Sequence, residues 1–312
     1  MKPKILLICP YLETVMESLH QCYDVVYWWE LKNQNAYLAE SGSEIRVLAT
    51  AGHMGASRQL IEALPNLEII CSYGVGYDAI DMGAAQEAAV PVTNTPEVLT
   101  DDVADMVIGM LLCLYRKIHV GDRYVRQGRW PQGELPLTRS IQGQTLGVFG
   151  LGRIGKAVAI RAEALGMKIA WCDIVGQPGV DWPHYGSILE LARACDVLCM
   201  SCNVTPKSLH IVNRQVLEAL GPQGSVVNSA RGLLIDEKAL IQALQNGKLW
   251  GAALDVFEDE PNVPEELYQF PNVVLQPHMG SATVSTRQAM GDLLIENLRR
   301  HFAGEQLLTQ VL

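Results

Sequence analysis

The sequence predicts an α/β protein with two doubly wound parallel sheets, in which one domain is inserted into the other. Short apolar runs alternate with helical patterns through the first hundred residues, and a second alternating series occupies 145–277. Strands that alternate with helices form βαβ units, which build parallel sheets. The chain ends in a further helical pattern over 283–301, after the second series is complete. We therefore expect the second domain to interrupt the first.

The first series contains five expected strands and a short amphipathic helix. The helix covers 57–65 and ends at Pro65, because proline cannot continue a helix. A long helix then begins at Thr100, whose hydroxyl can cap it, while Asp101 and Asp102 favour its positive N-terminus. The expected strands are KILLIC (4–9), DVVYWW (24–29), IRVLA (45–49), EIICSY (68–73) and PVTN (91–94).

The second series follows a segment rich in glycine, proline and polar residues, 126–143, which we interpret as a long loop with a function. Six parallel strands with helices between them suit a Rossmann-like or flavodoxin-like sheet. We place the inserted domain at 100–283 and form the other from 1–99 and 284–312. The expected strands are TLGVFG (145–150), KIAWCD (168–173), DVLCMS (196–201), SVVNSA (225–230), GAALDV (251–256) and NVVLQP (272–277).

The composition is that of a globular protein with ample material for a core. Of the 312 residues, 49% are hydrophobic and 19% are charged, and the formal net charge is −10. Lysine and arginine form no cluster, which argues against nucleic acid and anionic membranes as partners. The apolar run near the N-terminus has about five residues, too few for a signal peptide or a membrane span. We expect a cytoplasmic protein.

Three of the eight cysteines have a spacing that suits an iron–sulfur cluster. Cys195, Cys199 and Cys202 follow the pattern C-x3-C-x2-C, which can supply three thiolate ligands. However, Cys199 and Cys202 are three residues apart, so an extended chain directs them to opposite faces of a sheet. Free cysteine is also a common small buried residue. We therefore expect these cysteines to be free thiols that bind no metal, and we expect Cys202 to line a binding site at the carboxyl end of its strand.

A glycine-rich turn joins the first strand of the second series to the next helix. Gly150, Gly152 and Gly155 give the pattern G-x-G-x-x-G directly after an apolar strand. In order, they allow a tight turn, close approach of the backbone to a pyrophosphate, and close packing of helix on strand. Asp173 ends the following strand, where a carboxylate accepts the ribose hydroxyl protons of NAD and repels a 2′-phosphate. Since 174–177 contain no lysine or arginine, NADH is favoured, with NADPH as the alternative.

Charged side chains follow the last three expected strands. Arg231, Glu260 and His278 each come shortly after one of them, at the carboxyl end, where ligands bind in open α/β sheets. The guanidinium of Arg231 can bind the carboxylate and carbonyl oxygen of a 2-oxo acid. His278 can protonate that oxygen while hydride arrives from the nicotinamide, and Glu260 can pair with His278 and favour its protonated form. His53, in a loop after a strand, is a further candidate to touch the substrate.

These motifs resemble those of the D-isomer-specific 2-hydroxyacid dehydrogenases over most of the chain. The matching segments are YGVGYDAID (73–81), NTPEVLTDDVAD (94–105), GQTLGVFGLGRIG (143–155), VVNSARGLLIDEKAL (226–240), GAALDVFEDEP (251–261) and QPHMGSAT (276–283). The resemblance implies that Arg231, Glu260 and His278 are catalytic and that the backbone of Val75 and Gly76 binds the substrate carboxylate. It also implies cofactor contacts, with Asp255 at the nicotinamide carboxamide and others at Arg153, Ile154, Cys202, Asn203, Thr205, Ser229, Ala230 and Gly280.

Within that family, the chain looks most like the glyoxylate/hydroxypyruvate reductases, with phenylpyruvate-type reductases close behind. In these relatives the segment around Trp130 comes from a partner subunit and borders the substrate pocket, which implies a homodimer. Met54 and Trp130 are expected to shape that pocket. Two departures are present. Those reductases often prefer NADPH and carry Ser/Arg-type residues where this chain has CDIVGQ (172–177), and Asn203 stands where the family commonly has histidine.

The sequence thus predicts NAD(P)H-dependent reduction of a small 2-oxo acid, glyoxylate or hydroxypyruvate, to the D-2-hydroxy acid. Two alternatives remain open. One is a reductase of a bulkier aryl or branched 2-oxo acid, and the other is a non-catalytic NAD-sensing regulator, because this fold has been reused for transcriptional corepression. The sequence contains no disordered interaction tail, which argues against the regulator.

Overall fold

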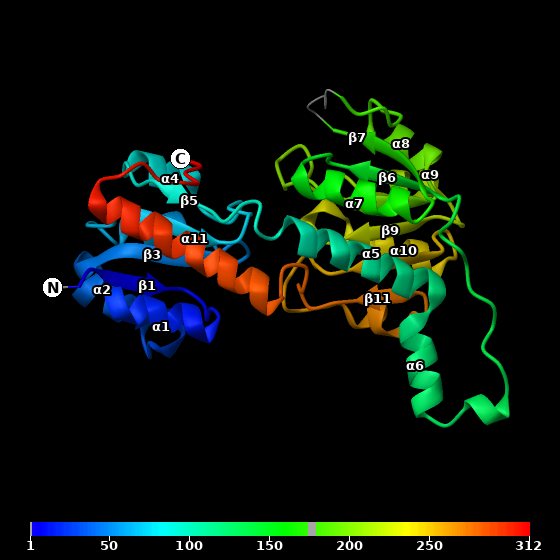
Figure 1. Ribbon diagram of the computed structural model, residues 1–312, viewed down its shortest axis with the longest axis horizontal. Coiled ribbons are helices and arrows are strands. Elements are labelled where there is room, and N and C mark those ends of the chain that lie inside the picture. Colours follow the sequence, from blue (N-terminus) through cyan, green and yellow to red (C-terminus); the bar gives the residue numbers. More distant parts are fainter. Residues whose placement is uncertain (1, 174–178) are drawn as a thin grey trace. The chain divides into compact units, whose positions relative to one another are not determined.

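The computed structural model describes residues 2–173 and 179–312 (Figure 1). The chain forms two compact units, one from Met1–Leu99 with Ser281–Leu312 and the other from Thr100–Gly280. The sequence places the return to the first domain at residue 284, three residues beyond the observed division. Over the described residues, no helix combines the length and the apolar character that crossing a membrane requires.

The first unit contains a parallel five-stranded sheet. Its strands are β1 (Lys4–Leu7), β2 (Asp24–Tyr27), β3 (Ile45–Ala51), β4 (Ile69–Tyr73) and β5 (Val92–Thr93), in the order β2-β1-β3-β4-β5. Its helices are α1 (Glu13–Cys22), α2 (Gln34–Ser41), α3 (Arg58–Glu62), α4 (Met82–Glu87) and α11 (Val284–Ala303). The strand expected at 24–29 ends earlier, at Tyr27, because β2 is an edge strand and its pairing with β1 stops at Leu7. Trp28–Glu30 form a 3-10 turn instead.

Helices cover both faces of this sheet. On one face, α3 and α4 bury Ile61 and Ala84 against the strands. On the other, α11 packs against β4 and α1. Gly291 allows that approach, since a Cβ there would lie 2.1 Å from Cγ2 of Val15.

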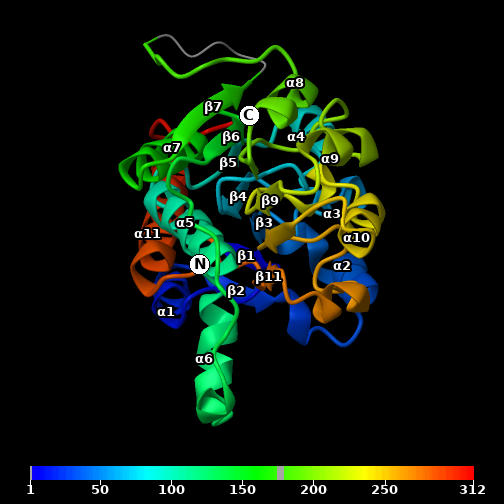
Figure 2. The ribbon, with the colours of Figure 1, turned by 90° about the vertical axis from the view of Figure 1, so that its right-hand side faces the viewer.

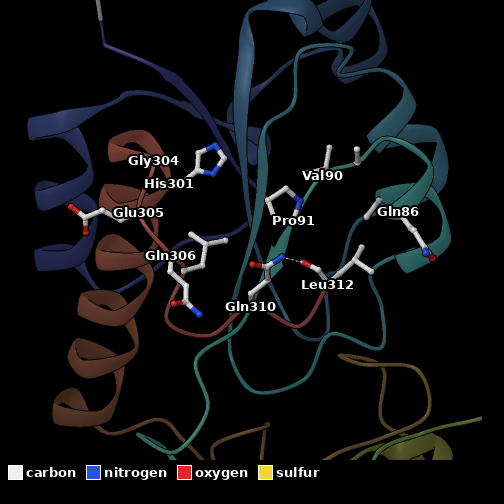
Figure 3. A pocket seen from close by; sticks show the side chains of 12 residues that line it. Gln86, Val90, Pro91, His301, Gly304, Glu305, Gln306, Gln310 and Leu312 are labelled. Carbon is white, nitrogen blue, oxygen red and sulfur yellow. Dashed lines mark hydrogen bonds between the residues drawn. The ribbon is translucent and has the colours of Figure 1, made fainter.

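The C-terminal residues close the sheet at β5. Thr93 pairs with Gln310 in an antiparallel bridge, and the N–H of Val311 donates to the carbonyl oxygen of Val92 at 2.8 Å. Fully buried Asn297 of α11 holds this tail through bonds to Leu308 and Thr309. An open groove of about 550 Å³ lies beside the tail, between α4 and the end of α11 (Figure 3). No candidate residue of the sequence lines this groove.

The second unit contains a parallel six-stranded sheet. Its strands are β6 (Thr145–Phe149), β7 (Lys168–Cys172), β8 (Val197–Met200), β9 (Ser225–Asn228), β10 (Gly251–Leu254) and β11 (Val273–Leu275), in the order β11-β10-β9-β8-β6-β7. Its helices are α5 (Thr100–Arg116), α6 (Ile118–Arg126), α7 (Arg153–Ala164), α8 (Ile188–Ala194), α9 (Arg214–Leu220) and α10 (Glu237–Gln245). Short 3-10 turns cover Trp130–Gln132, Gly232–Leu234 and Glu265–Gln269.

Apolar side chains are buried on both faces of this sheet, as β8 illustrates. Leu198 and Met200 join the core layer beneath α8, α9 and α10. Val197 and Cys199 join the opposite layer, beneath α5 and α7. Successive side chains of a strand point to opposite faces, so helices must cover both. Both units are therefore parallel sheets with helices on two faces, and the predicted α/β doubly wound fold is confirmed.

Candidate active site

The candidate residues of the second unit lie at one edge of its sheet. Because all six strands are parallel, their carboxyl ends share that edge, where ligands of open α/β sheets bind. Every strand is followed by a candidate from the sequence. They are Gly150 after β6, Asp173 after β7, Cys202 after β8, Arg231 after β9, Asp255 after β10 and His278 after β11.

The turn between β6 and α7 has the shape that a pyrophosphate site requires. Gly150 has a φ of +96°, a left-handed conformation that favours glycine. A Cβ at Gly155 would lie 2.0 Å from the carbonyl oxygen of Gly150 and 3.1 Å from Cγ1 of Val148, so α7 packs tightly on β6. A Cβ at Gly152 would meet nothing within 4 Å. Gly152 thus leaves open space at the N-terminus of α7, which fits a phosphate group.

Asp173 connects the end of β7 to this turn. Its Oδ2 accepts a hydrogen bond of 2.7 Å from the N–H of Leu151. The carboxylate therefore lies beside the glycine turn, where ribose recognition needs it. Arg153 and Ile154 form the first turn of α7, whose N-terminus attracts anions. Residues 174–177, on which the sequence argument against NADPH also depends, lie outside the described residues.

The residues that follow β8 pack against Gly150. A Cβ at Gly150 would lie 2.8 Å from the backbone nitrogen of Cys202 and equally close to its Cβ. Asn203 and Thr205 continue into a turn that Ser208 closes. The hydroxyl of Ser208 donates to the carbonyl oxygen of Asn203 at 3.0 Å and accepts from the N–H of Thr205 at 2.7 Å. Cys202 thus lies beside the glycine turn at the carboxyl end of β8, and its contact with a cofactor stays a prediction.

Asn228, at the end of β9, shapes the segment that carries Arg231. Its side-chain amide donates to the carbonyl oxygen of Arg231 at 2.8 Å, and its side-chain oxygen accepts from the N–H of Ala230 at 3.0 Å. Asn228 is fully buried. Asn228 is not among the candidates that the sequence predicts, and the signal for it is weak: a polar residue ends an otherwise apolar strand.

Asp255 connects the ends of three neighbouring strands. Its Oδ1 accepts from the N–H of Met279 at 2.6 Å, and its Oδ2 accepts from the N–H of Gly280 at 2.8 Å and the hydroxyl of Ser229 at 3.1 Å. Burial raises the pKa of the Asp255 carboxyl, while the Met279 bond and the charge of His278 oppose the rise. Asp255 therefore holds the 278–280 turn in place. Its contact with the nicotinamide carboxamide stays a prediction.

His278 and Glu260 form a close pair. Nδ1 of His278 lies 2.7 Å from Oε2 of Glu260, while Oε1 of Glu260 accepts from the N–H of Phe257 at 3.1 Å. The carboxylate is thus oriented by the backbone as it meets the ring. His278 has a φ of +54°, which is uncommon outside glycine, and its N–H donates to the carbonyl oxygen of Asp255 at 2.8 Å. Backbone strain of this kind is frequent at functional sites.

Met54, Val75 and Gly76 belong to the first unit, at the carboxyl edge of its own sheet. Met54 lies in the loop after β3 with 49% of its surface exposed, and Val75 and Gly76 follow β4. The two loops are in backbone contact, since a Cβ at Gly52 would lie 2.8 Å from the carbonyl oxygen of Gly76. The side chain of Asn94 donates to the carbonyl oxygen of Val75 at 2.8 Å. The contact of Gly52 with Gly76 places the loop that carries Met54 beside the loop that carries Val75 and Gly76.

Trp130 lies on a different part of the second unit, in the segment that follows α6. Lys117, with a φ of +51°, separates α5 from α6, and α6 projects away from the sheet of its own unit (Figure 2). Trp130 is 65% exposed and Leu137 is 99% exposed, and Val125 of α6 is also exposed. The expected loop, 126–143, begins on the last residue of α6, Arg126, and beyond it only Trp130–Gln132 have regular structure. Large exposed apolar side chains of this kind mark interaction surfaces.

Cys195, Cys199 and Cys202 do not converge. Cys195 belongs to the core layer beneath α8, α9 and α10, whereas Cys199 belongs to the layer on the opposite face of the sheet. Burial raises the pKa of each of the three thiols to about 12, which disfavours the thiolate that a cluster needs. Within 2–173 and 179–312, no three histidine, cysteine or acidic side chains are grouped to hold a metal ion. The iron–sulfur alternative therefore has no geometric support in this part of the chain.

Comparison with known families agrees with this geometry. The family model described as "D-isomer specific 2-hydroxyacid dehydrogenase, NAD binding domain" matches residues 108–280, which is more than half of the chain. The chain belongs to the D-isomer-specific 2-hydroxyacid dehydrogenases. The resemblance stated from the sequence motifs is thereby confirmed.

Relatives of this dehydrogenase match along nearly its whole length. It is 46% identical over 307 residues to glyoxylate/hydroxypyruvate reductase A HPR2 of Arabidopsis thaliana and 45% identical over 307 residues to hydroxyphenylpyruvate reductase of Plectranthus scutellarioides. Each alignment covers 98% of both chains. A crystal structure of an NADPH-dependent glyoxylate/hydroxypyruvate reductase from Sinorhizobium meliloti, in complex with NADP and malonate, is 42% identical. It has a TM-score of 0.94 and covers 100% of this chain and 97% of that one. The dehydrogenase is thus an NAD(P)-dependent enzyme that reduces 2-oxo acids.

Proposed function

We propose that this dehydrogenase uses NADH to reduce a small 2-oxo acid, glyoxylate or hydroxypyruvate, giving the D isomer where the product is chiral. The observation that carries the proposal is the pair of His278 and Glu260, 2.7 Å apart at the carboxyl edge of the sheet, two strands from the one that Arg231 follows. A proton-donating imidazole that is paired with a carboxylate, together with a guanidinium group, suits the reduction of a 2-oxo acid, whose carbonyl lies next to its own carboxylate. The glyoxylate/hydroxypyruvate reductases among the relatives support the choice of substrate.

The proposed roles follow from the chemistry of each side chain. The guanidinium of Arg231 binds the substrate carboxylate and polarises the carbonyl oxygen. His278 donates a proton to that oxygen as hydride reaches the carbonyl carbon, and Glu260 orients the imidazole through Nδ1 and stabilises its positive charge. When bound, the reduced nicotinamide supplies the hydride. The backbone N–H groups of Val75 and Gly76 are proposed to bind the carboxylate as well. Replacement of His278 by Gln should abolish most turnover while NADH binding persists.

The proposed cofactor contacts form three groups along the carboxyl edge of the sheet. Gly150, Gly152 and Gly155, with the N-terminus of α7, suit the pyrophosphate, because a Cβ at Gly152 would fill the open space there. Arg153 and Ile154, in the first turn of α7, are proposed beside the pyrophosphate. The residues proposed near the ribose and adenine are Asp173, Cys202, Asn203 and Thr205. Those proposed near the nicotinamide are Ser229, Ala230, Asp255 and Gly280.

The preference for NADH rests on Asp173. Its carboxylate lies beside the glycine turn and would repel the 2′-phosphate of NADPH. Asp173→Asn is the matched test, because the asparagine oxygen can still accept from the N–H of Leu151 while the charge is lost. We expect the ratio of kcat/KM for NADH over NADPH to fall about tenfold, which corresponds to about 1.4 kcal/mol. A wild-type enzyme that works faster with NADPH would refute the assignment.

We also propose a homodimer that buries the exposed apolar residues around Trp130. Ile118, Val125 and Leu137 add to that surface, and burying it would stabilise a dimer. Light scattering after size-exclusion chromatography should give twice the chain mass of 34.3 kDa. Leu137→Asp should shift the mass to one chain. If Trp130 borders a partner's substrate pocket, Trp130→Ala should raise KM for the oxo acid in a protein that stays dimeric.

A bulkier aryl 2-oxo acid is the second candidate substrate. The observation in its favour is the 45% identity to hydroxyphenylpyruvate reductase, together with the exposed Met54, a side chain that adapts to different partners. The test follows NADH absorbance with glyoxylate, hydroxypyruvate, pyruvate and phenylpyruvate. A higher kcat/KM for phenylpyruvate would favour the bulkier substrate. No turnover with any of the four would overturn the proposed reaction and favour a non-catalytic NAD-binding role.

A further inference from the structure

Two acidic residues outside the proposed catalytic set hold together the segments that carry Arg231 and Glu260. The N–H of Glu237 donates to Oε1 of Glu258 at 2.9 Å, and the N–H of Glu258 donates to Oε1 of Glu237 at 2.9 Å. Glu237 begins α10, shortly after Arg231, and Glu258 lies two residues before Glu260. Each carboxylate therefore binds the backbone of the other segment. We call this reciprocal arrangement the Glu237–Glu258 clamp.

The clamp fixes one particular peptide, the one that joins Phe257 to Glu258. The N–H of this peptide, which belongs to Glu258, donates to the carboxylate of Glu237, and the backbone of Gly232 packs directly on the same peptide. A Cβ at Gly232 would lie 1.9 Å from the carbonyl carbon and oxygen of Phe257 and 2.5 Å from the nitrogen of Glu258. The preceding amide, the N–H of Phe257, donates to Oε1 of Glu260. The orientation of the backbone at Phe257 therefore determines the position of the Glu260 carboxylate, which contacts His278.

A third segment contacts the same cluster through His210. Its Nε2 lies 3.1 Å from Oε1 of Glu258, and its N–H donates to the carbonyl oxygen of Leu233 at 2.8 Å. His210 has a φ of +48°, so its backbone is held in an uncommon conformation. The segments around His210, Gly232 and Glu258 are thus all in contact with one another.

The Glu237 carboxyl is buried, with 8% of the residue exposed. A buried carboxyl is retained where hydrogen bonds compensate for its lost hydration. Burial raises the pKa of Glu237, more than the nearby charges of Glu258, Asp259 and Glu260 do. Each bond of the clamp needs one acceptor oxygen and no negative charge. The arrangement is therefore suited to holding backbone geometry rather than to exchanging a proton with substrate.

We propose that the Glu237–Glu258 clamp is a positioning device for the reaction, which holds Glu260 in the orientation that meets His278 and keeps Arg231 at the same edge. The inference rests on the proposed roles of those three residues. A misplacement of about 1 Å in a catalytic geometry can lower a rate on the order of 100-fold. Without the clamp, kcat should therefore fall about 10- to 100-fold.

The test compares Glu237→Ala, Glu237→Gln and Glu258→Ala in the full-length enzyme. Glu237→Ala should lower kcat about tenfold or more while the Kd for NADH stays within about twofold, because the glycine turn is untouched. Glu237→Gln should recover most of the lost kcat, since its amide oxygen still accepts from the N–H of Glu258. Glu258→Ala, at a more exposed position, removes the reciprocal bond and serves if Glu237→Ala does not fold. The NMR shifts of the His278 imidazole should change in both alanine variants without added substrate.

Asp196→Ala is the matched control. Oδ2 of Asp196 also accepts a backbone N–H, that of Thr145 at 2.7 Å, but at the opposite edge of the same sheet. It should lower the melting temperature without lowering kcat. The proposal is overturned if both alanine variants keep wild-type kcat, or if Glu237→Gln is as slow as Glu237→Ala. Unchanged His278 shifts in the alanine variants would also overturn it. A wild-type enzyme with no turnover would instead refute the proposed function, and the imidazole shifts would still report on the clamp.

Discussion

Two alanine substitutions in one turn should separate cofactor binding from folding. Gly152 has φ −69° and ψ −164°, which alanine adopts without strain, and a Cβ there would meet nothing within 4 Å. We expect Gly152→Ala to keep or raise the free energy of unfolding, by about 0.4–1 kcal/mol, because the unfolded chain loses freedom. The added methyl group occupies the space in front of α7. Binding of NADH should therefore weaken although the protein is as stable as before.

Gly155→Ala should have the opposite effect on stability. Its Cβ would lie 2.0 Å from the carbonyl oxygen of Gly150, whereas ordinary contacts begin at 3.4 Å, so a gap of about 1.4 Å must open between α7 and the turn. Overpacking of this kind costs about 1–3 kcal/mol, and the better helix propensity of alanine returns at most about 1 kcal/mol. Because the contact is with backbone, the cost lies in the upper part of that range, about 2–3 kcal/mol, and the free energy of unfolding should fall by about 1–2 kcal/mol.

The assay combines urea unfolding with fluorescence titration of NADH. For Gly152→Ala we expect the Kd to rise at least about tenfold, which corresponds to about 1.4 kcal/mol. Gly109→Ala is the control, since Gly109 lies in α5 and a Cβ there would also meet nothing within 4 Å. It should leave NADH binding unchanged. If Gly152→Ala bound NADH like the wild type, the cofactor would not approach this turn, and a Gly155→Ala protein of wild-type stability would refute the packing argument.

Three further predictions concern other parts of the molecule. A thiol reagent at pH 8 should label the exposed Cys22 in the folded protein but should label Cys199 only after unfolding. Burial raises the pKa of the Cys199 thiol to about 12, so this thiol is almost wholly protonated at pH 8. Mass spectrometry of the labelled peptides measures the difference. Asn297→Ala should lower the free energy of unfolding by about 2–4 kcal/mol in urea, since it removes the partner of the Leu308 N–H and a bond to the Thr309 hydroxyl in the C-terminal tail. A loss below about 0.5 kcal/mol would show that the tail is held by other contacts. Burial raises the pKa of Glu237 in the folded protein above its ordinary 4.5. As pH rises from 4.5 towards the raised pKa, the unfolded chain loses this proton before the folded protein does. The free energy of unfolding of the wild type therefore falls over this pH range. Glu237→Gln should lack this fall, and identical pH curves for the two proteins would contradict the raised pKa.

Motifs within short stretches were predicted well, because their signals lie between neighbours in the chain. The apolar run before Gly150 and the glycine spacing predict a strand, a tight turn and a close-packed helix, and the positive φ of Gly150 and the 2.0 Å approach at Gly155 agree with them. The period-two argument that separates Cys199 from Cys202 likewise needs no tertiary information. Strand ends were less accurate, since β2 stops where its pairing with β1 stops, which no local pattern records.

The sequence by itself determined the fold class, the family and the identity of the charged residues at the strand ends. The tertiary structure decided how those residues are held. That Asp255 binds the backbone of Met279 and that Glu237 and Glu258 exchange backbone bonds both depend on segments more than twenty residues apart in the chain. The physical reason is that a buried polar group must find its partner wherever the packed chain provides one. That partner is set by the packing of the whole sheet, and residue spacing along the sequence does not reveal it.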